Sequence, residues 1–210
     1  MLRNWVMIAI LLLPFASAVK ADVITENFET FADGDVLTNQ SAGMLFSNAV
    51  VLAAGVSLND AEFPPHSGNN VATDNGGPMS ITFSDLAVSF SAYFTYLEPL
   101  TLTAYDASNN VVGTVTSLFS GNYVSTGNPP NELISLNVLG GFSSLVISAD
   151  PFGGSFVIDD ISVTTQAAGP VSGVPEPSSV AVLAVALGLL VLTRKLAISR
   201  DTGPRSGQAV

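Results

Sequence analysis

Apolar and polar residues alternate along most of the chain between Asp22 and Thr165, which is the pattern of half-buried β-strands. Leu86–Thr95 is the clearest case. One face of this predicted strand would carry Val88, Phe90, Ala92 and Phe94, and the other Ala87, Ser89, Ser91, Tyr93 and Thr95. Such a segment is expected to bury the first face in a core and to leave the second outside.

Leu100–Tyr105 alternates in the same way, and Val111–Leu118 predicts a returning strand. Asp106–Asn110 between them has the composition of a turn, so the three segments together predict a hairpin. The other predicted strands are Asp22–Phe28, Met44–Leu52, Met79–Phe83, Leu133–Leu139, Ser144–Ser148 and Ser155–Thr164.

Clusters of Gly, Asn, Pro and Ser separate these segments, and no stretch between residues 22 and 165 has a helical stripe of apolar residues. Many short strands with regularly spaced turns are typical of two-layer antiparallel folds. The predicted fold class is therefore all-β, an antiparallel β-sandwich or jelly roll over residues 22–165, with a targeting segment on each side.

The first 18 residues have the pattern of a signal peptide for export by the Sec pathway. Arg3 supplies the positive start, Trp5–Leu13 the apolar stretch, and Pro14 ends the helix. Ala16–Ala18 is a small-x-small cleavage site for signal peptidase, and Val19–Ala21 is a second possible one. The distance from Pro14 favours cleavage after Ala18.

The other end of the chain predicts a membrane segment. After a small-residue linker, 166–173, an apolar run of 13 residues lies within a predicted transmembrane helix, 179–193. Arg194 and Lys195 follow as a stop-transfer signal, which places the tail, 201–210, in the cytoplasm. The run would extend roughly 20 Å as a helix, less than a hydrocarbon core of about 30 Å, which favours a transient hold in the inner membrane.

Residues 174–200 resemble the PEP-CTERM sorting domain of Gram-negative bacteria. Three features carry the resemblance in fixed order: the motif Val174, Pro175, Glu176 and Pro177, the short apolar helix, and the basic pair. The resemblance implies that an exosortase recognises the motif and cuts near it. It also implies release to the cell surface or the exopolysaccharide matrix. Leu196–Val210 departs from the family, which usually ends soon after the basic residues.

The predicted domain is strongly acidic. All six Lys and Arg residues lie outside residues 22–169, whereas 15 of the 17 Asp and Glu residues lie within it, since only Glu176 and Asp201 fall beyond. Such a surface repels phosphate backbones and excludes nucleic acid as a partner. It attracts cations, of which Ca²⁺ suits oxygen ligands. The chain has no cysteine, so disulfides and thiolate chemistry are excluded.

Two acidic stretches are candidates for a structural Ca²⁺ site. Asp33 and Asp35 flank a glycine shortly after Glu29, and a solvated turn is the alternative interpretation of that spacing. Residues 26–29 and 156–161 resemble the first and last strands of carbohydrate-binding-module-like jelly rolls. That resemblance implies a Ca²⁺ between Glu29 and Asp160. The predicted ligand set is Glu29, Asp33, Asp35, Asp159 and Asp160.

The remaining chemistry is sparse. His66 is the only histidine, which disfavours zinc catalysis, and spacing shows neither a nucleophile nor an orienting acid beside it. The only tryptophan, Trp5, leaves with the signal peptide, so the aromatic residues that could contact a sugar are Tyr93, Tyr96, Tyr105 and Tyr123.

The sequence therefore predicts a non-enzymatic exported protein with a structural or interaction role at the cell surface or in the matrix. The alternative is a carbohydrate-binding module acting in the exopolysaccharide matrix. A hydrolase using paired carboxylates is a third class, for which no motif is present.

Overall fold

The computed structural model describes residues 21–166, 183, 185–187 and 189. The chain divides into two units, Met1–Ala168 and Gly169–Val210. Described residues beyond 166 are helical, and no helix in the described part of the chain is long and apolar enough to cross a membrane. The predicted signal peptide, nearly all of the linker, and the sorting motif with its basic pair lie outside the described residues. So does most of the predicted transmembrane helix.

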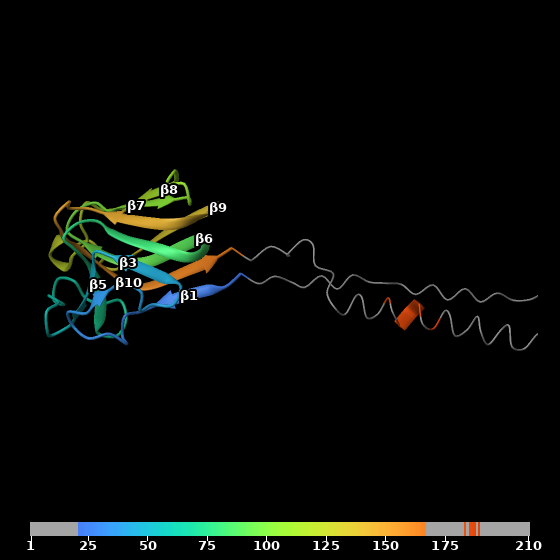
Figure 1. The fold of residues 1–210 in the computed structure, drawn as a ribbon. Coiled ribbons are helices and arrows are strands. Elements are labelled where there is room, and N and C mark those ends of the chain that lie inside the picture. The colour runs from blue at the N-terminus through green and yellow to red at the C-terminus, as the bar shows by residue number, and fades with distance from the viewer. Residues whose placement is uncertain (1–20, 167–182, 184, 188, 190–210) are drawn as a thin grey trace, which may run out of the picture. The chain divides into compact units, whose positions relative to one another are not determined.

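Ten antiparallel strands and one short 3₁₀ turn, Val124–Thr126, make up the first unit (Figure 1). All strand pairs in this unit are antiparallel, which confirms the all-β prediction. The strands are β1 Val23–Glu26, β2 Val36–Leu37, β3 Met44–Ser47, β4 Ala49–Ala53, β5 Asn70–Asn75, β6 Met79–Tyr96, β7 Thr101–Tyr105, β8 Val111–Thr116, β9 Glu132–Ser148 and β10 Gly153–Thr165.

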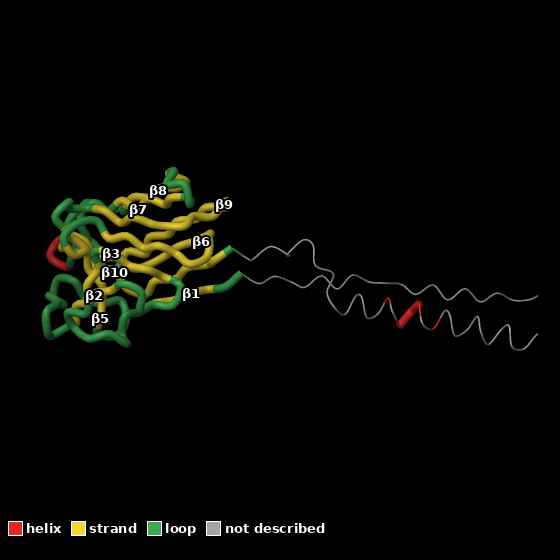
Figure 2. Tube along the Cα trace, viewed as in Figure 1, coloured by secondary structure: helices red, strands yellow, loops and turns green. Residues whose placement is uncertain are grey.

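Two long strands, β6 and β9, run through both layers of the sandwich (Figure 2). The first half of β6 pairs with β3 and the second half of β9, beside β7 and β8. The second half of β6 pairs with β10 and the first half of β9, beside β5 and β4. One apolar core fills the space between these layers, with aromatic rings from Phe28, Phe90, Phe94, Phe142 and Phe156. The finer jelly-roll topology stays a prediction.

The predicted strand limits were wrong at three places, each for a local reason. Met79–Phe83 and Leu86–Thr95 are one bent strand, β6, and β9 likewise joins two predicted strands. The middle of β6 is polar and the middle of β9 is rich in Gly, so both sequences resemble turns. In the structure the pairing of β6 with β9 shifts register there but continues. Conversely, Met44–Leu52 breaks at Asn48, whose φ of 54° divides it into β3 and β4.

β5 was missed altogether. Its first five residues, from Asn70 to Asp74, are all buried, so no apolar–polar alternation marks it. The inner face of this strand meets the main core. Its outer face is covered by the segment between β4 and β5, residues 54–69, which we call the cover loop. Leu58 and Phe63 of this loop pack with Val71 and Val157 in a second, smaller apolar cluster.

Candidate functional site

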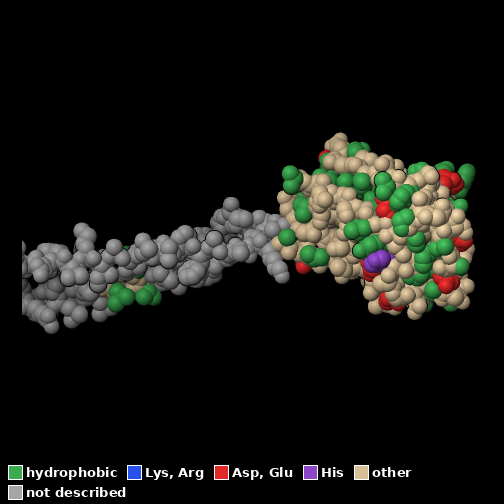
Figure 3. All heavy atoms as spheres, turned by 180° about the vertical axis from the view of Figure 1, so that it is seen from behind, with side chains coloured by type: hydrophobic (Ala, Val, Ile, Leu, Met, Phe, Trp, Pro, Cys, Tyr) green, Lys and Arg blue, Asp and Glu red, His purple; other side chains and the backbone are tan. Residues whose placement is uncertain are grey.

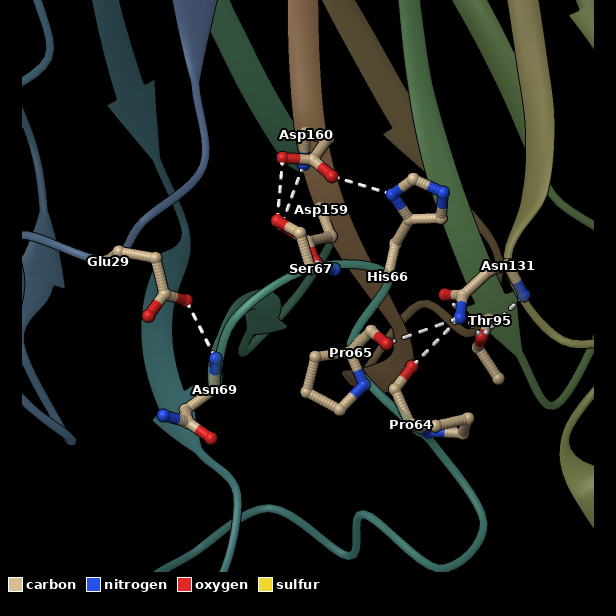
Figure 4. Close-up of polar contacts among 10 residues, drawn as sticks. All are labelled: Glu29, Pro64, Pro65, His66, Ser67, Asn69, Thr95, Asn131, Asp159 and Asp160. Carbon is tan, nitrogen blue, oxygen red and sulfur yellow. Dashed lines mark hydrogen bonds and ion pairs between the residues drawn. The ribbon is translucent and has the colours of Figure 1, made fainter.

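A β-bulge in β10 places two adjacent carboxylates on the outer face of the sheet. Asp159 pairs with Tyr93 of β6, but the next pair along the strand is Ser162 with Ser91, so β10 has one extra residue. Asp160 takes up the extra length with a φ of 48°. Strict alternation would turn Ile161 outward, yet Ile161 is buried and both Asp side chains reach the outer side (Figure 4).

These two carboxylates hold the end of the cover loop. The Ser67 N–H donates to Asp159 Oδ2 at 2.8 Å, and the Ser67 hydroxyl donates to Asp160 Oδ1 at 2.9 Å (Figure 4). His66 Nδ1 lies 2.6 Å from Asp160 Oδ2. Because both carboxylates come from the bulge, this strand irregularity fixes where the loop ends.

Two further side chains secure the same loop on either side of His66. Glu29 Oε1 accepts hydrogen bonds from the N–H groups of Asn69 and Asn70, at 2.9 and 2.7 Å. Asn131 Nδ2 donates to the Pro64 carbonyl at 3.2 Å (Figure 4). The loop is therefore attached to the segment after β1, to β10 and to the residue before β9, and His66 has a defined position.

The imidazole of His66 stacks on the ring of Tyr93 from β6. The two ring centroids lie 3.4 Å apart and the planes differ by 8°. One face of the imidazole is thus covered, but 35% of the side chain stays exposed, and the histidine is visible on the surface of the domain (Figure 3). With Nδ1 bound to Asp160, the other ring nitrogen points away from β10 (Figure 4).

Burial raises the pKa of Asp159 to about 6, with a smaller contribution from the neighbouring charge of Asp160. Hydrogen bonds from the N–H groups of Ser67 and Asp160 oppose this rise. The Ser67 N–H therefore favours the ionised form of the carboxylate that holds the loop.

A shallow depression lies beside the Asp160 carboxylate, where β1 runs next to β10. Its volume is 440 Å³. The side chains around it are polar apart from Ile161, and Asp160 connects it with His66. The lining residues are Thr25, Glu26, Asn27, Thr30, Asp160, Ile161 and Ser162.

Small polar side chains continue from this depression across four strands. The strand register aligns one row of hydroxyls, and the next row runs parallel to it with two hydroxyls and one amide. None of these residues is buried, and none is charged. We call the two rows the polar face. They consist of Thr25, Ser162, Ser91 and Ser135, and of Val23, Thr164, Ser89 and Asn137.

The arrangement around His66 is suited to binding and lacks a nucleophile. Asp160 and His66 form the acid–imidazole pair that orients a general base. Ser67, the hydroxyl nearest in sequence, donates to Asp160 and not to the imidazole. Acyl-transfer chemistry needs the hydroxyl bonded to the base, so the described residues do not assemble it.

The predicted calcium ligands divide into separate places. Asp33 accepts hydrogen bonds from the Ser57 hydroxyl and the Ala53 N–H, and the first of these lowers the pKa of its carboxyl. Asp35 accepts the Ala32 N–H at 2.8 Å and so caps a turn, whereas Asp33 binds the end of β4 at Ala53.

Asp159 and Asp160 lie together, and Glu29 binds the same end of the cover loop two residues further along, at Asn69 and Asn70. Within residues 21–166, no three His, Cys, Asp or Glu side chains are grouped closely enough to hold a metal ion. Because the five carboxylates lie in separate places, they do not form one Ca²⁺ site in this arrangement. Calcium binding stays a prediction.

The tyrosines also differ from their expected roles. Tyr96 is fully buried, and burial together with a hydrogen bond to Glu132 raises its pKa to about 12, so it cannot contact a sugar. Tyr123 stacks on Phe63 of the cover loop with ring centroids 6.1 Å apart. Sequence reasoning missed the exposed aromatic surface of His66, and its only signal was a histidine after two prolines in a loop.

No family model matches the chain, and no curated protein matches it. Several solved structures have a similar arrangement of strands. One is the K2 cleaved adhesin domain of Lys-gingipain, 15% identical, with a TM-score of 0.48 over 69% of this chain and 100% of that one.

Another is a DUF4465 family protein from Bacteroides caccae, 11% identical, with a TM-score of 0.44 over 69% of this chain and 100% of that one. A third is a family 29 carbohydrate-binding module, 13% identical, with a TM-score of 0.40 over 75% of this chain and 98% of that one.

Proposed function

We propose that this chain is an exported, non-enzymatic protein of the cell surface or matrix, and that an exosortase-type enzyme processes it. The observation that carries the proposal is the order of features in residues 174–195. These are the Pro-Glu-Pro motif, an apolar run shorter than the hydrocarbon core of a membrane, and a basic pair. The inner membrane holds such a chain only until cleavage.

The domain supports a role without chemistry. Its hydrogen-bonded carboxylates hold loops, and its acid–imidazole pair lacks a nucleophile. Its 15 acidic residues and absence of Lys and Arg keep an exported domain soluble.

Mass spectrometry of the mature protein tests the proposal. In cells that contain an exosortase, the wild-type protein should lose the apolar run 180–192, and a variant with Pro175, Glu176 and Pro177 changed to Ala should retain it. Pro170→Ala, in the linker, is the matched control and should be processed like the wild type. Retention of the apolar run by the wild-type protein would replace sorting with a permanent anchor.

Carbohydrate binding is the second candidate, and the polar face favours it. Two rows of uncharged, exposed or partly exposed side chains lie next to a partly exposed aromatic stack. A glycan array separates this function from a purely structural role. Binding of a defined set of glycans supports it, and an array without signal rules it out.

A further inference from the structure

We propose that the polar face and its depression bind a neutral polysaccharide, with the imidazole of His66 as the surface on which a sugar ring packs. The proposal rests on the carbohydrate-binding candidate function, and it adds the place of binding and the class of ligand. It does not depend on the sorting segment.

The extent of the polar face suits an extended chain. Each row crosses four strands, from β1 over β10 and β6 to β9. Strands in a sheet lie about 4.8 Å apart, so a row is roughly 14 Å long. The depression interrupts this surface at β1 and β10, where a substituent of a sugar ring could be inserted.

The hydrogen-bonding groups match sugar hydroxyls. Ser and Thr hydroxyls donate and accept, as sugar hydroxyls do, so either direction of hydrogen bond is available along the rows. Glu26 and Asp160 in the depression add carboxylate oxygens, which form stronger, charge-assisted bonds with hydroxyl donors. A lipid or an apolar peptide would leave these groups without partners when bound.

The aromatic contact is preorganised. Tyr93 supports one face of the imidazole, and Asp160 fixes its Nδ1 edge. Neighbouring bonds from Ser67 to both carboxylates prevent the loop from shifting the ring along the sheet. A ring held in this way loses little conformational entropy when a ligand packs on it.

Charge selects the class of polysaccharide. Residues 22–169 contain no Lys or Arg and 15 acidic residues, and two of the acidic side chains line the depression. A polymer of uronic or sulfated sugars would be repelled by this field and would meet no cation. A polymer of amino sugars would be attracted by the whole surface in a salt-sensitive way. A neutral polymer is the class whose binding would depend on this local pattern of hydrogen-bond donors and acceptors and not on the overall charge.

Affinity electrophoresis and calorimetry of the full chain, in micelles of a detergent without sugar groups, test the proposal. The neutral probes are dextran, xyloglucan and glucomannan, with alginate as the uronic and chitosan as the amino polymer. Two variants remove different parts of the site: His66→Ala removes the ring, and Ser162→Gln fills the centre of the first row. Ser47→Gln on β3, an exposed strand serine in the other layer, is the matched control.

We expect at least one neutral probe to bind the wild type and the control alike. Ser162→Gln and His66→Ala should each weaken binding about tenfold, with thermal melting showing that both variants fold. Unchanged binding by Ser162→Gln would place the site elsewhere and leave carbohydrate binding standing. Binding of alginate or chitosan alone would overturn the ligand class. Binding of none of the five polymers would overturn the carbohydrate-binding candidate itself, and the sorting proposal would be unaffected.

Discussion

The outer face of the layer that contains β10 and β6 has two halves with opposite chemistry. In the first half, Val71 and Val157 are buried beneath the cover loop. In the second, Ser91 and Ser162 occupy equivalent outward positions, and both are partly exposed among the residues that the structure describes. β10 contributes to both halves, so the halves differ in the side chains that this strand presents as well as in what lies over it.

The boundary between these halves coincides with the bulge at Asp159 and Asp160. The cover loop reaches this point and is bonded there through Ser67. Beyond it, the side chains are small and uncharged. The comparison indicates that the first half stabilises the domain, whereas the second half can be changed at little cost and is available to a ligand.

The largest expected effect is a charge placed in the covered half. Val71→Asp would bury a carboxylate against Leu58 and Phe63 without a partner, and the free energy of unfolding should fall by at least about 3 kcal/mol. Ser135→Asp, in the open half, should change it by less than about 0.5 kcal/mol. Denaturant unfolding of both variants measures the difference, and equal losses would contradict the division into halves.

Loss of the boundary anchor should have the next largest effect. Asp160→Ala removes the acceptor for His66 and Ser67 and leaves an Ala at a φ of 48°, so unfolding should become easier by about 2 kcal/mol. Asp160→Asn keeps an acceptor and tolerates this backbone conformation, and should lose clearly less. Both values come from denaturant titrations. A similar loss in the two variants would show that charge, and not geometry, holds the loop.

Lowering the pH should stabilise the folded protein through Asp159. Its folded pKa, raised to about 6, lies above the ordinary Asp value, so the folded state binds more protons between about pH 4 and 6. Stability should therefore rise by about 1 kcal/mol as the pH falls through this window. Asp33, Glu62 and Asp106, whose pKa values are lowered, oppose this rise as the pH falls through their ordinary values, which for Glu62 is 4.5.

Asp159→Asn is the variant that isolates this contribution. It keeps an acceptor for the Ser67 N–H and removes the titration, so the curve of stability against pH should be flatter by the same amount. If the wild-type and variant curves have the same slope between pH 4 and 6, Asp159 does not cause the dependence of stability on pH.

The smallest expected effect concerns the aromatic stack. Tyr93→Leu removes the ring under His66 and should cost about 1 kcal/mol, whereas Tyr93→Phe keeps the ring and should cost less than about 0.5 kcal/mol. Chemical shifts of the His66 ring protons report the stack directly. They should change strongly in the Leu variant alone, and a shift preserved in that variant would show that Tyr93 does not position the imidazole.

Local alternation was enough to predict much of the fold. Phe90 and Phe94 are buried as their spacing required, and β7 pairs with β8 across the predicted turn. Alternation did not predict burial where a distant segment of the chain covers the outer face of a strand. Thr95 was expected outside, but Asn131 bonds to it and its exposure is 0%.

The candidate site was less predictable for the same reason. The sequence identified Asp159 and Asp160 as notable carboxylates, but their partners, His66 and Ser67, lie more than 90 residues away. Spacing between neighbours carries no information about such contacts. The bulge that brings both carboxylates to one face has no marker in the sequence either, since Ile-Asp-Asp-Ile also fits a regular strand.

The bulge gives β10 one residue more than its partner strand β6. Because Asp160 is that extra residue, its deletion would leave Asp159 opposite Tyr93 and Ser162 opposite Ser91, so Ile161 and Val163 would stay in the core and the polar face would be kept. The deletion would remove only the contacts of Asp160 with His66 and Ser67. The bulge is thus a place in β10 where a residue can be removed without turning the following side chains to the other face of the sheet.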